Sequence, residues 1–260
     1  MIRQGENLLT ENKRGKLKYE PDLKTVSFLD KRYYKRSEDV YYPSVTTYLD
    51  YMPKNKFFQE WVKDVGHNAD IILERAAREG NQVHSAVEEL VLGNTVNWLD
   101  EYGNTKYNYL VWNMILKFHE FWTTYKPTLI KTEGVVYSDE HKYAGRYDLL
   151  VDLDKEVWLL DVKTSNSLHK TYDVQLSCYV KALKETLDVD VQRAGIIWLK
   201  AQTRGESKKK GIYQGKGWQI KEVEDFDHNF ELFKHVQAFF LEDNGDTMPN
   251  TIKIPTTLSL

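Results

Sequence analysis

The sequence contains very little cysteine: Cys178 is the only one in 260 residues. A single thiol cannot form an intrachain disulfide framework or supply the four thiolates that hold an iron–sulfur cluster. This shortage is typical of a protein in a reducing cytoplasm. We expect Cys178 to be a small buried apolar residue rather than a nucleophile.

Long apolar runs and a strong charge imbalance are also lacking. No stretch approaches the roughly 18 consecutive apolar residues of a membrane span, and the opening MIRQGENLLTENKRGK lacks the apolar core of a secretion signal. We therefore expect a soluble cytoplasmic protein without a membrane partner, either bacterial or phage-encoded and located in the host cytoplasm. The net charge of -3 argues against coating nucleic acid by overall charge, but it is compatible with a local basic groove.

The composition supports a sizeable hydrophobic core, since 41% of the residues are hydrophobic and 13% aromatic. We expect one elaborated domain over residues 1–260. Its predicted parts are peripheral N-terminal strands over 1–43, a helical part over 44–128, a catalytic α/β core over 129–200, and a basic loop, strand pair and C-terminal helix over 201–260.

The helical part begins at Ser44 or Thr46, both of which are residue types that cap helices. A long helical region is expected from about residue 54 to Gly80, where glycine acts as a stop signal. A separate helix then follows from Asn81, a possible cap, to Gly93, a terminator. A third helix is predicted before Pro127.

Strand-like patterns begin at Leu129. Three short β-rich runs, LIKTEGVVYS, GRYDLLVDL and EVWLLDVKT, are separated by turn-forming clusters and predict a meander. A helix over TYDVQLSCYVKALKETL and a buried strand RAGIIWLK follow. This order predicts an α/β sandwich in which helices flank a central mixed sheet.

Charged residues interrupt two of these apolar strands. Side chains alternate along a strand, so Asp161 and Lys163 share one face about 7 Å apart. If the two runs pair as a hairpin, Asp148 lies close to Asp161. Crowded carboxylates favour a divalent cation, and oxygen ligands with open positions suit Mg²⁺ or Mn²⁺. Lys163 would stabilise charge on a phosphate or activate water, so the pattern predicts phosphodiester hydrolysis. The alternative is an exposed ion pair on a surface hairpin, worth about 0–1 kcal/mol.

The ordered motifs resemble those of the PD-(D/E)xK nuclease superfamily and, within it, the RecB-type exonucleases. They are PSVTTYL, GNQVHSAVEE, AGRYDLL, LLDVKTS and QLSCYVKAL, spread over about residues 44–200. The resemblance implies a restriction-endonuclease-like fold. The iron–sulfur branch of the family is excluded because it needs four cysteines.

The resemblance also implies a role for each matching residue. Asp148 and Asp161 would bind the metal with the main-chain carbonyl of Val162, and His84 would add a ligand from a helix. Lys163 would be the catalytic lysine. The remaining pair, which would hold that lysine or the DNA backbone, is Gln175 and Tyr179. These two residues are four apart and so share one helical face.

Two further acids are candidates for a supporting role. Glu88 follows His84 by one helical turn and could orient it or reach the metal through water, although a solvated helix acid fits as well. Glu133 stands in the first core strand and could border the site. Candidate phosphate-binding residues lie in two basic stretches, for which a solvated surface is the alternative: Lys31, Arg32, Lys35, Arg36, Arg204, Lys208, Lys209 and Lys210.

Together these features predict a Mg²⁺- or Mn²⁺-dependent exonuclease that digests linear DNA in recombination, repair or phage DNA metabolism. DNA is the expected partner, and a recombination, single-strand-binding or annealing protein is a further candidate. No helicase motor motif is present, so a partner would have to unwind duplexes. The alternatives are a structure-specific endonuclease of the same fold, a catalytically silent nucleic-acid-binding module, and hydrolysis of RNA.

Overall fold

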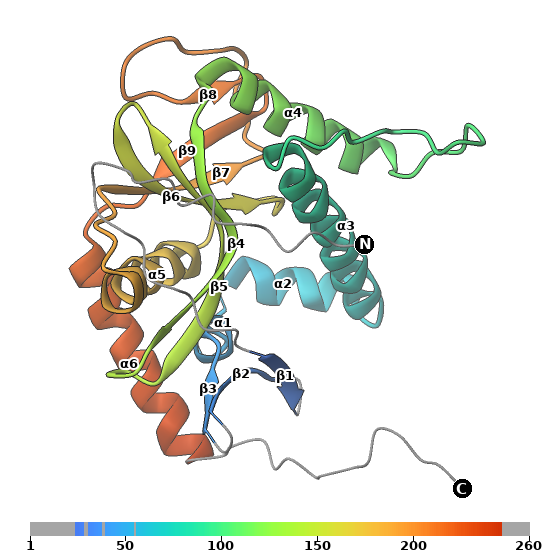
Figure 1. Cartoon of the computed structure of the whole chain (residues 1–260). Helices are drawn as coiled ribbons and strands as arrows, with labels where there is room; N and C mark the ends of the chain where they lie inside the picture. Colours follow the sequence, from blue (N-terminus) through green and yellow to red (C-terminus); the bar gives the residue numbers. More distant parts are fainter. Residues whose placement is uncertain (1–23, 29–30, 38–39, 55, 246–260) are drawn as a thin grey trace, which may run out of the picture.

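The computed structural model describes residues 24–28, 31–37, 40–54 and 56–245. Its centre is a six-stranded sheet in the order β4-β5-β6-β7-β9-β8, with helices on both faces (Figure 1). The predicted α/β sandwich with a central mixed sheet is confirmed. No helix among the described residues combines the length and the apolar character that crossing a membrane requires.

The sheet is antiparallel except where β6 lies parallel to β7. Its strands are β4 (Thr128–Ser138), β5 (Tyr143–Leu153), β6 (Glu156–Lys163), β7 (Arg193–Trp198), β8 (Gln214–Gly215) and β9 (Trp218–Glu222). Asp154 and Lys155, both with positive φ, make the tight turn between β5 and β6. The parallel β6–β7 connection runs through α5 (Lys170–Leu187), because parallel neighbours need a crossover.

The helices divide between the two faces of the sheet (Figure 1). Helices α3 (Asn68–Val91) and α4 (Tyr109–Tyr125) pack with β-strand residues in one core cluster. Helices α1 (Val45–Leu49), α5 and α6 (Phe226–Asn244) pack with the strands in another. The alternation of Leu149 and Leu150, which belong to different clusters, shows how β5 serves both faces.

Strand β6 lies inside the sheet, and its residues from Val157 to Val162 are all buried. A strand covered on both faces is expected to be apolar throughout. Asp161 breaks that rule, since only 3% of its surface is exposed. A buried carboxylate is costly unless charges or hydrogen bonds compensate it, so the surroundings of Asp161 need an explanation.

The predicted helix boundary at Gly80 is wrong. The chain forms α2 (Lys56–Val65), breaks at Gly66 with φ of 54°, and then continues as α3 straight through Gly80 and Asn81. A Cβ atom at Gly80 would lie 3.2 Å from Thr164 Oγ1, so glycine lets the helix pass close to the end of β6. The predicted terminator Gly93 does follow the end of α3, with φ of 83°.

The N-terminal strands form a separate three-stranded sheet of β1 (Lys24–Phe28), β2 (Lys31–Ser37) and β3 (Val40–Pro43). The sequence predicts a peripheral position, yet Tyr34 and Tyr42 are buried against Ala144 of β5. These aromatic side chains therefore extend the core beyond the central sheet. Residues 1–23, 29–30 and 38–39 of the predicted N-terminal part lie outside the described residues. Cys178 is buried, as predicted.

Ser44 is the N-cap of α1, and its Oγ accepts a hydrogen bond from the Thr47 amide at 3.0 Å. We expect Ser44→Ala to lower the free energy of unfolding by about 1 kcal/mol because that amide loses its partner. Urea denaturation measures the change. Thr124→Ala, at an exposed position on α4, is the control and should change stability less. Equal losses in the two variants would contradict the capping role.

Candidate active site

Three carboxylates lie across three neighbouring strands of the central sheet. The β4–β5 register places Glu133 opposite Asp148. The β5–β6 register, continued one residue past Leu149, places Asp148 opposite Asp161. Like charges that face one another across strands destabilise a sheet. The row formed by Glu133, Asp148 and Asp161, here called the acid row, therefore needs positive charge beside it.

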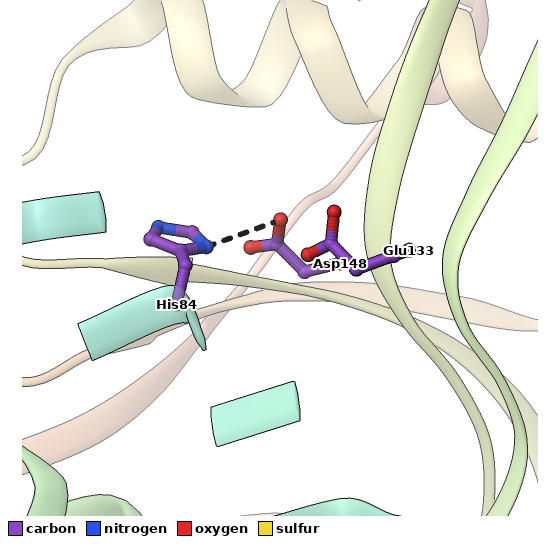
Figure 2. Close-up of side chains that lie close together, drawn as sticks. All are labelled: His84, Glu133 and Asp148. Atoms are coloured by element: carbon purple, nitrogen blue, oxygen red, sulfur yellow. Dashed lines mark ion pairs between the residues drawn. The ribbon is translucent and has the colours of Figure 1, made fainter. Parts of the chain in front are cut away.

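Helix α3 supplies part of that charge through His84. Its Nδ1 lies 3.4 Å from Asp148 Oδ1, and Figure 2 shows the imidazole and the Glu133 carboxylate on either side of Asp148. One potential ligand atom from each of these three residues lies within 4.8 Å of the others. The Asp148 carboxylate raises the pKa of His84 to about 9, although burial opposes the charge. Without a metal, the imidazole therefore carries a proton at neutral pH.

Asp148 is held from two directions. Its Oδ1 faces His84, while its Oδ2 accepts a hydrogen bond of 2.7 Å from the Val162 amide. Burial opposes ionisation, but the charges of His84 and Lys163 and the Val162 amide hold the pKa of Asp148 below its usual value. Asp148 is thus kept ionised at the junction of α3, β5 and β6.

The backbone of Glu133 is more strained than the backbone of Asp148 or Asp161. Its backbone has φ of 50°, in the left-handed region that costs a non-glycine residue about 1–3 kcal/mol. Burial and the Asp148 charge raise the pKa of Glu133 to about 7. Glu88 of α3 adds to this shift, which places both predicted supporting acids near the row. The crowding indicates a surplus of negative charge.

Lys163 supplies positive charge at the Asp161 end of the acid row. Its Nζ lies 2.7 Å from Asp161 Oδ2, and the two side chains are 18% and 4% exposed. No described donor makes a hydrogen bond of good geometry to that buried oxygen, so the contact is an ion pair with unused acceptor capacity. Burial opposes the charge of Lys163, but Asp161 and Asp148 raise its pKa. Burial, with Asp148, raises the pKa of Asp161 although Lys163 opposes this.

Helix α5 fixes Lys163 from the opposite face of the sheet. Lys163 Nζ donates to Gln175 Oε1 at 3.5 Å, and Gln175 Nε2 donates to the Tyr179 hydroxyl at 3.1 Å. The Tyr172 ring centroid lies 4.8 Å from the ammonium group, a cation–π contact. Tyr179 packs closely against Gly145 of β5, where a Cβ atom would lie 2.2 Å from the ring. The structure thus joins Gln175 and Tyr179 to the lysine in one chain of contacts.

A hollow of about 210 Å³ opens beside these residues and exposes the lysine end of the acid row. Its lining includes His84, Lys163, Thr164, Ser165, Tyr172 and Lys200. Sequence reasoning missed Thr164, Ser165 and Lys200. A signal was present, because Lys200 follows the strand parallel to β6, and the carboxyl ends of parallel neighbours meet at one edge. We name this space the catalytic hollow.

The basic stretches lie elsewhere. Lys31 contacts Asn244 and the Phe240 ring on α6, while Arg36 pairs with Asp139 at 3.1 Å and covers Tyr137. The loop over residues 203–211 lies at the opposite end of the molecule from β1–β3 (Figure 1). Within the described chain, the lining of the catalytic hollow includes none of the basic residues predicted to bind phosphate, which are Lys31, Arg32, Lys35, Arg36, Arg204, Lys208, Lys209 and Lys210.

The residues present fit a divalent cation. The acid row has three carboxylates against one lysine and one imidazole, and carboxylate oxygens with an imidazole nitrogen are ligands of Mg²⁺- and Mn²⁺-type sites. The closest group of potential ligands is His84, Glu133 and Asp148. It contains two of the predicted ligands but replaces Asp161, which is paired with Lys163, by Glu133.

Comparison with known families gives one match. The family model described as the PD-(D/E)XK nuclease superfamily matches residues 56–251. That range includes His84, the whole acid row and Lys163. No curated protein matches the chain.

Gly145 is predicted to be essential for the placement of Tyr179. We expect Gly145→Ala to lower the free energy of unfolding by about 1–3 kcal/mol, because the new methyl group overlaps the tyrosine ring. Urea denaturation measures the loss. Gly205→Ala is the matched control, since a Cβ atom there meets nothing within 4 Å. Equal stability of the two variants would show that the ring moves away at no cost.

Metal binding should stabilise the protein through Asp148. A ligand present at 100 times its dissociation constant stabilises the native state by about 2.7 kcal/mol, so Mn²⁺ should raise the melting temperature of the wild type. Asp148→Asn should lose most of that increase, because it removes a charge at the centre of the acid row. Asp64→Asn, at an exposed position on α2, should keep it. Differential scanning calorimetry with and without Mn²⁺ checks this, and an undiminished increase in Asp148→Asn would refute the site.

Proposed function

The chain belongs to the PD-(D/E)XK nuclease superfamily, and from this premise we propose that it is a Mg²⁺- or Mn²⁺-dependent deoxyribonuclease of the RecB type. The proposed reaction is hydrolysis of phosphodiester bonds from the ends of linear DNA. The observation that supports it best is the acid row, with His84 beside its central member Asp148 and with Lys163, which lines the catalytic hollow, paired with Asp161 at its end.

The proposed roles follow from position and charge. His84, Asp148 and Glu133 or Asp161 hold the ion, together with the Val162 carbonyl as the family resemblance implies. The bound ion supplies Lewis-acid stabilisation of phosphate oxygens and a water of lowered pKa. These residues therefore define where the scissile phosphate sits.

Lys163 would act on the phosphate as a cation. Its raised pKa keeps the ammonium form at neutral pH, which suits stabilisation of developing negative charge better than proton abstraction. Asp161 orients Lys163 through the ion pair, and Gln175 with Tyr179 restricts the lysine from the other side. These three are positioning residues for the lysine in the proposed mechanism.

The finer parts of the proposal rest on the order of the sequence motifs. They are the exonuclease mode, the DNA substrate and a role in recombination, repair or phage DNA metabolism. A cytoplasmic location is proposed from the single cysteine. A single-strand-binding or annealing protein is the proposed companion, because such a partner would handle the strand that remains after digestion.

The test compares end-labelled linear DNA with covalently closed circles of the same sequence in Mg²⁺ and in Mn²⁺. We expect degradation of the linear DNA and survival of the circles. Lys163→Ala should bind DNA but turn over at least about a hundredfold more slowly, the effect of losing one electrostatic stabiliser. Lys63→Ala, an exposed lysine on α2, should behave as wild type.

Each alternative function has its own outcome in this test. Cleavage of circles at a comparable rate would make the protein an endonuclease. Binding without cleavage would make it a silent binding module. Faster cleavage of a matched RNA would reassign the substrate.

A further inference from the structure

A second hollow adjoins the catalytic hollow along α3. It has a volume of about 450 Å³ and is lined by Arg75, Arg78, Glu79, Asn81, Gln82 and Asn108. Glu79 also lines the catalytic hollow, so the two spaces meet at this side chain. We name the second space the α3 hollow.

All the residues that line the α3 hollow are polar or charged, with more positive than negative charge, although most of the surface that they present to it is apolar and comes from their side-chain carbons. Arg75 and Arg78 are three residues apart and lie on the same side of the helix. The only acid in the lining is Glu79, whose Oε1 accepts a hydrogen bond of 2.9 Å from the side-chain Nδ2 of Asn108. Guanidinium groups and side-chain amides suit an anionic ligand, and the planar guanidinium matches the geometry of phosphate oxygens.

Both arginines are available to a ligand. Arg78 contacts Glu74 at 3.7 Å, but both side chains are about 70% exposed, so water screens this pair and its contribution is small. Among the described residues, Arg75 makes no ion pair within 4.0 Å. An incoming phosphate can therefore replace water around these groups without breaking a buried interaction.

The start of α4 reinforces this charge. Asn108 lines the α3 hollow and caps the helix, since its Oδ1 accepts a hydrogen bond from the Val111 amide at 2.9 Å. The amino-terminal end of a helix carries partial positive charge that favours anions. The rim of the α3 hollow thus combines two arginines with a helix end.

We infer that the α3 hollow binds a backbone phosphate of the same DNA strand whose scissile phosphate lies in the catalytic hollow. This inference rests on the proposed nuclease function. Along the axis of α3, Arg78 and Arg75 lie about 9 Å and about 14 Å from His84, and the rotation of about 100° per residue places Arg75 about 180° around the helix from His84. The strand would therefore cross over α3 at Glu79, the residue that lines both hollows.

The experiment removes the two arginines and measures the salt dependence of binding. A fluorescein-labelled single strand of 12 nucleotides is titrated in metal-free buffer at several salt concentrations, with fluorescence anisotropy as the readout. For Arg75→Ala/Arg78→Ala we expect weaker binding by about fivefold or more at low salt. The slope of log K against log salt should become shallower by about 0.7 for each DNA phosphate that the variant no longer neutralises.

The matched control removes two partly exposed lysines from the opposite face of the sheet. Lys181→Ala/Lys234→Ala has the same change in net charge and should keep the wild-type slope. A small chromogenic phosphodiester, bis(p-nitrophenyl) phosphate, provides a second readout with Mn²⁺. It cannot reach the α3 hollow, so the arginine variant should hydrolyse it at the wild-type rate, while its KM for the 12-nucleotide strand should rise.

Two outcomes would overturn the inference. One is a salt slope of the arginine variant equal to that of the lysine control; the other is a loss confined to a matched RNA strand. If the wild type hydrolyses neither the diester nor DNA, the nuclease function fails, but the salt slope still tests whether the α3 hollow binds phosphate. A loss of diester hydrolysis by the arginine variant alone would indicate damage to the catalytic hollow and would also overturn a separate phosphate role.

Discussion

The acid row imposes the main physical constraint on this structure. Glu133, Asp148 and Asp161 stand on three adjacent strands, and Asp161 is buried in β6, where every residue from Val157 to Val162 is buried. Removing a single partner from a buried charge typically costs several kcal/mol, so the positions of His84 and Lys163 cannot vary freely. Burial and the charge of Asp148 raise the pKa of Glu133 and of Asp161, whereas His84, Lys163 and the Val162 amide hold the pKa of Asp148 below its usual value. The fold has to bring α3, β6 and α5 together at this point.

Close approaches at glycines make that meeting possible. Gly80 lets α3 pass beside Thr164 at the end of β6, and Gly145 lets the Tyr179 ring lie against β5. A Cβ atom at Gly145 would overlap the Tyr179 ring, whereas a Cβ atom at Gly80 would require only a small shift of the Thr164 side chain. Glycine in the interior of a helix costs about 1 kcal/mol relative to alanine, and at Gly80 this cost accompanies the close approach of α3 to Thr164.

The sequence predicts the parts of the site that depend on local pattern. Asp148, Asp161 and Lys163 could be found because charges are conspicuous in apolar strands, and His84 because its motif GNQVHSAVEE resembles that of the nuclease family. Glu133 could not be ranked above an ordinary strand acid, since its place opposite Asp148 depends on strand register and on an unusual backbone conformation. The lining residues Thr164 and Lys200 come together only through the parallel pairing of β6 and β7. The signal for that pairing is the order of β6, α5 and β7 along the chain, because parallel neighbours need a crossover, and no single residue carries it.

The error at Gly80 bears on function as well as on fold. Two helices joined at that glycine would leave the orientation of Arg75 and Arg78 relative to His84 undefined. A single helix fixes it, because each residue adds about 1.5 Å of rise and 100° of rotation. Helix α3 therefore carries a potential metal ligand and two guanidinium groups on one rigid rod, which Gly80 sets against the end of β6. A strand that crosses over this helix from the catalytic hollow to the α3 hollow would meet phosphate-binding groups whose relative positions are set by the helix backbone, so the distance from the second bound phosphate to the cleaved bond would not depend on a flexible loop.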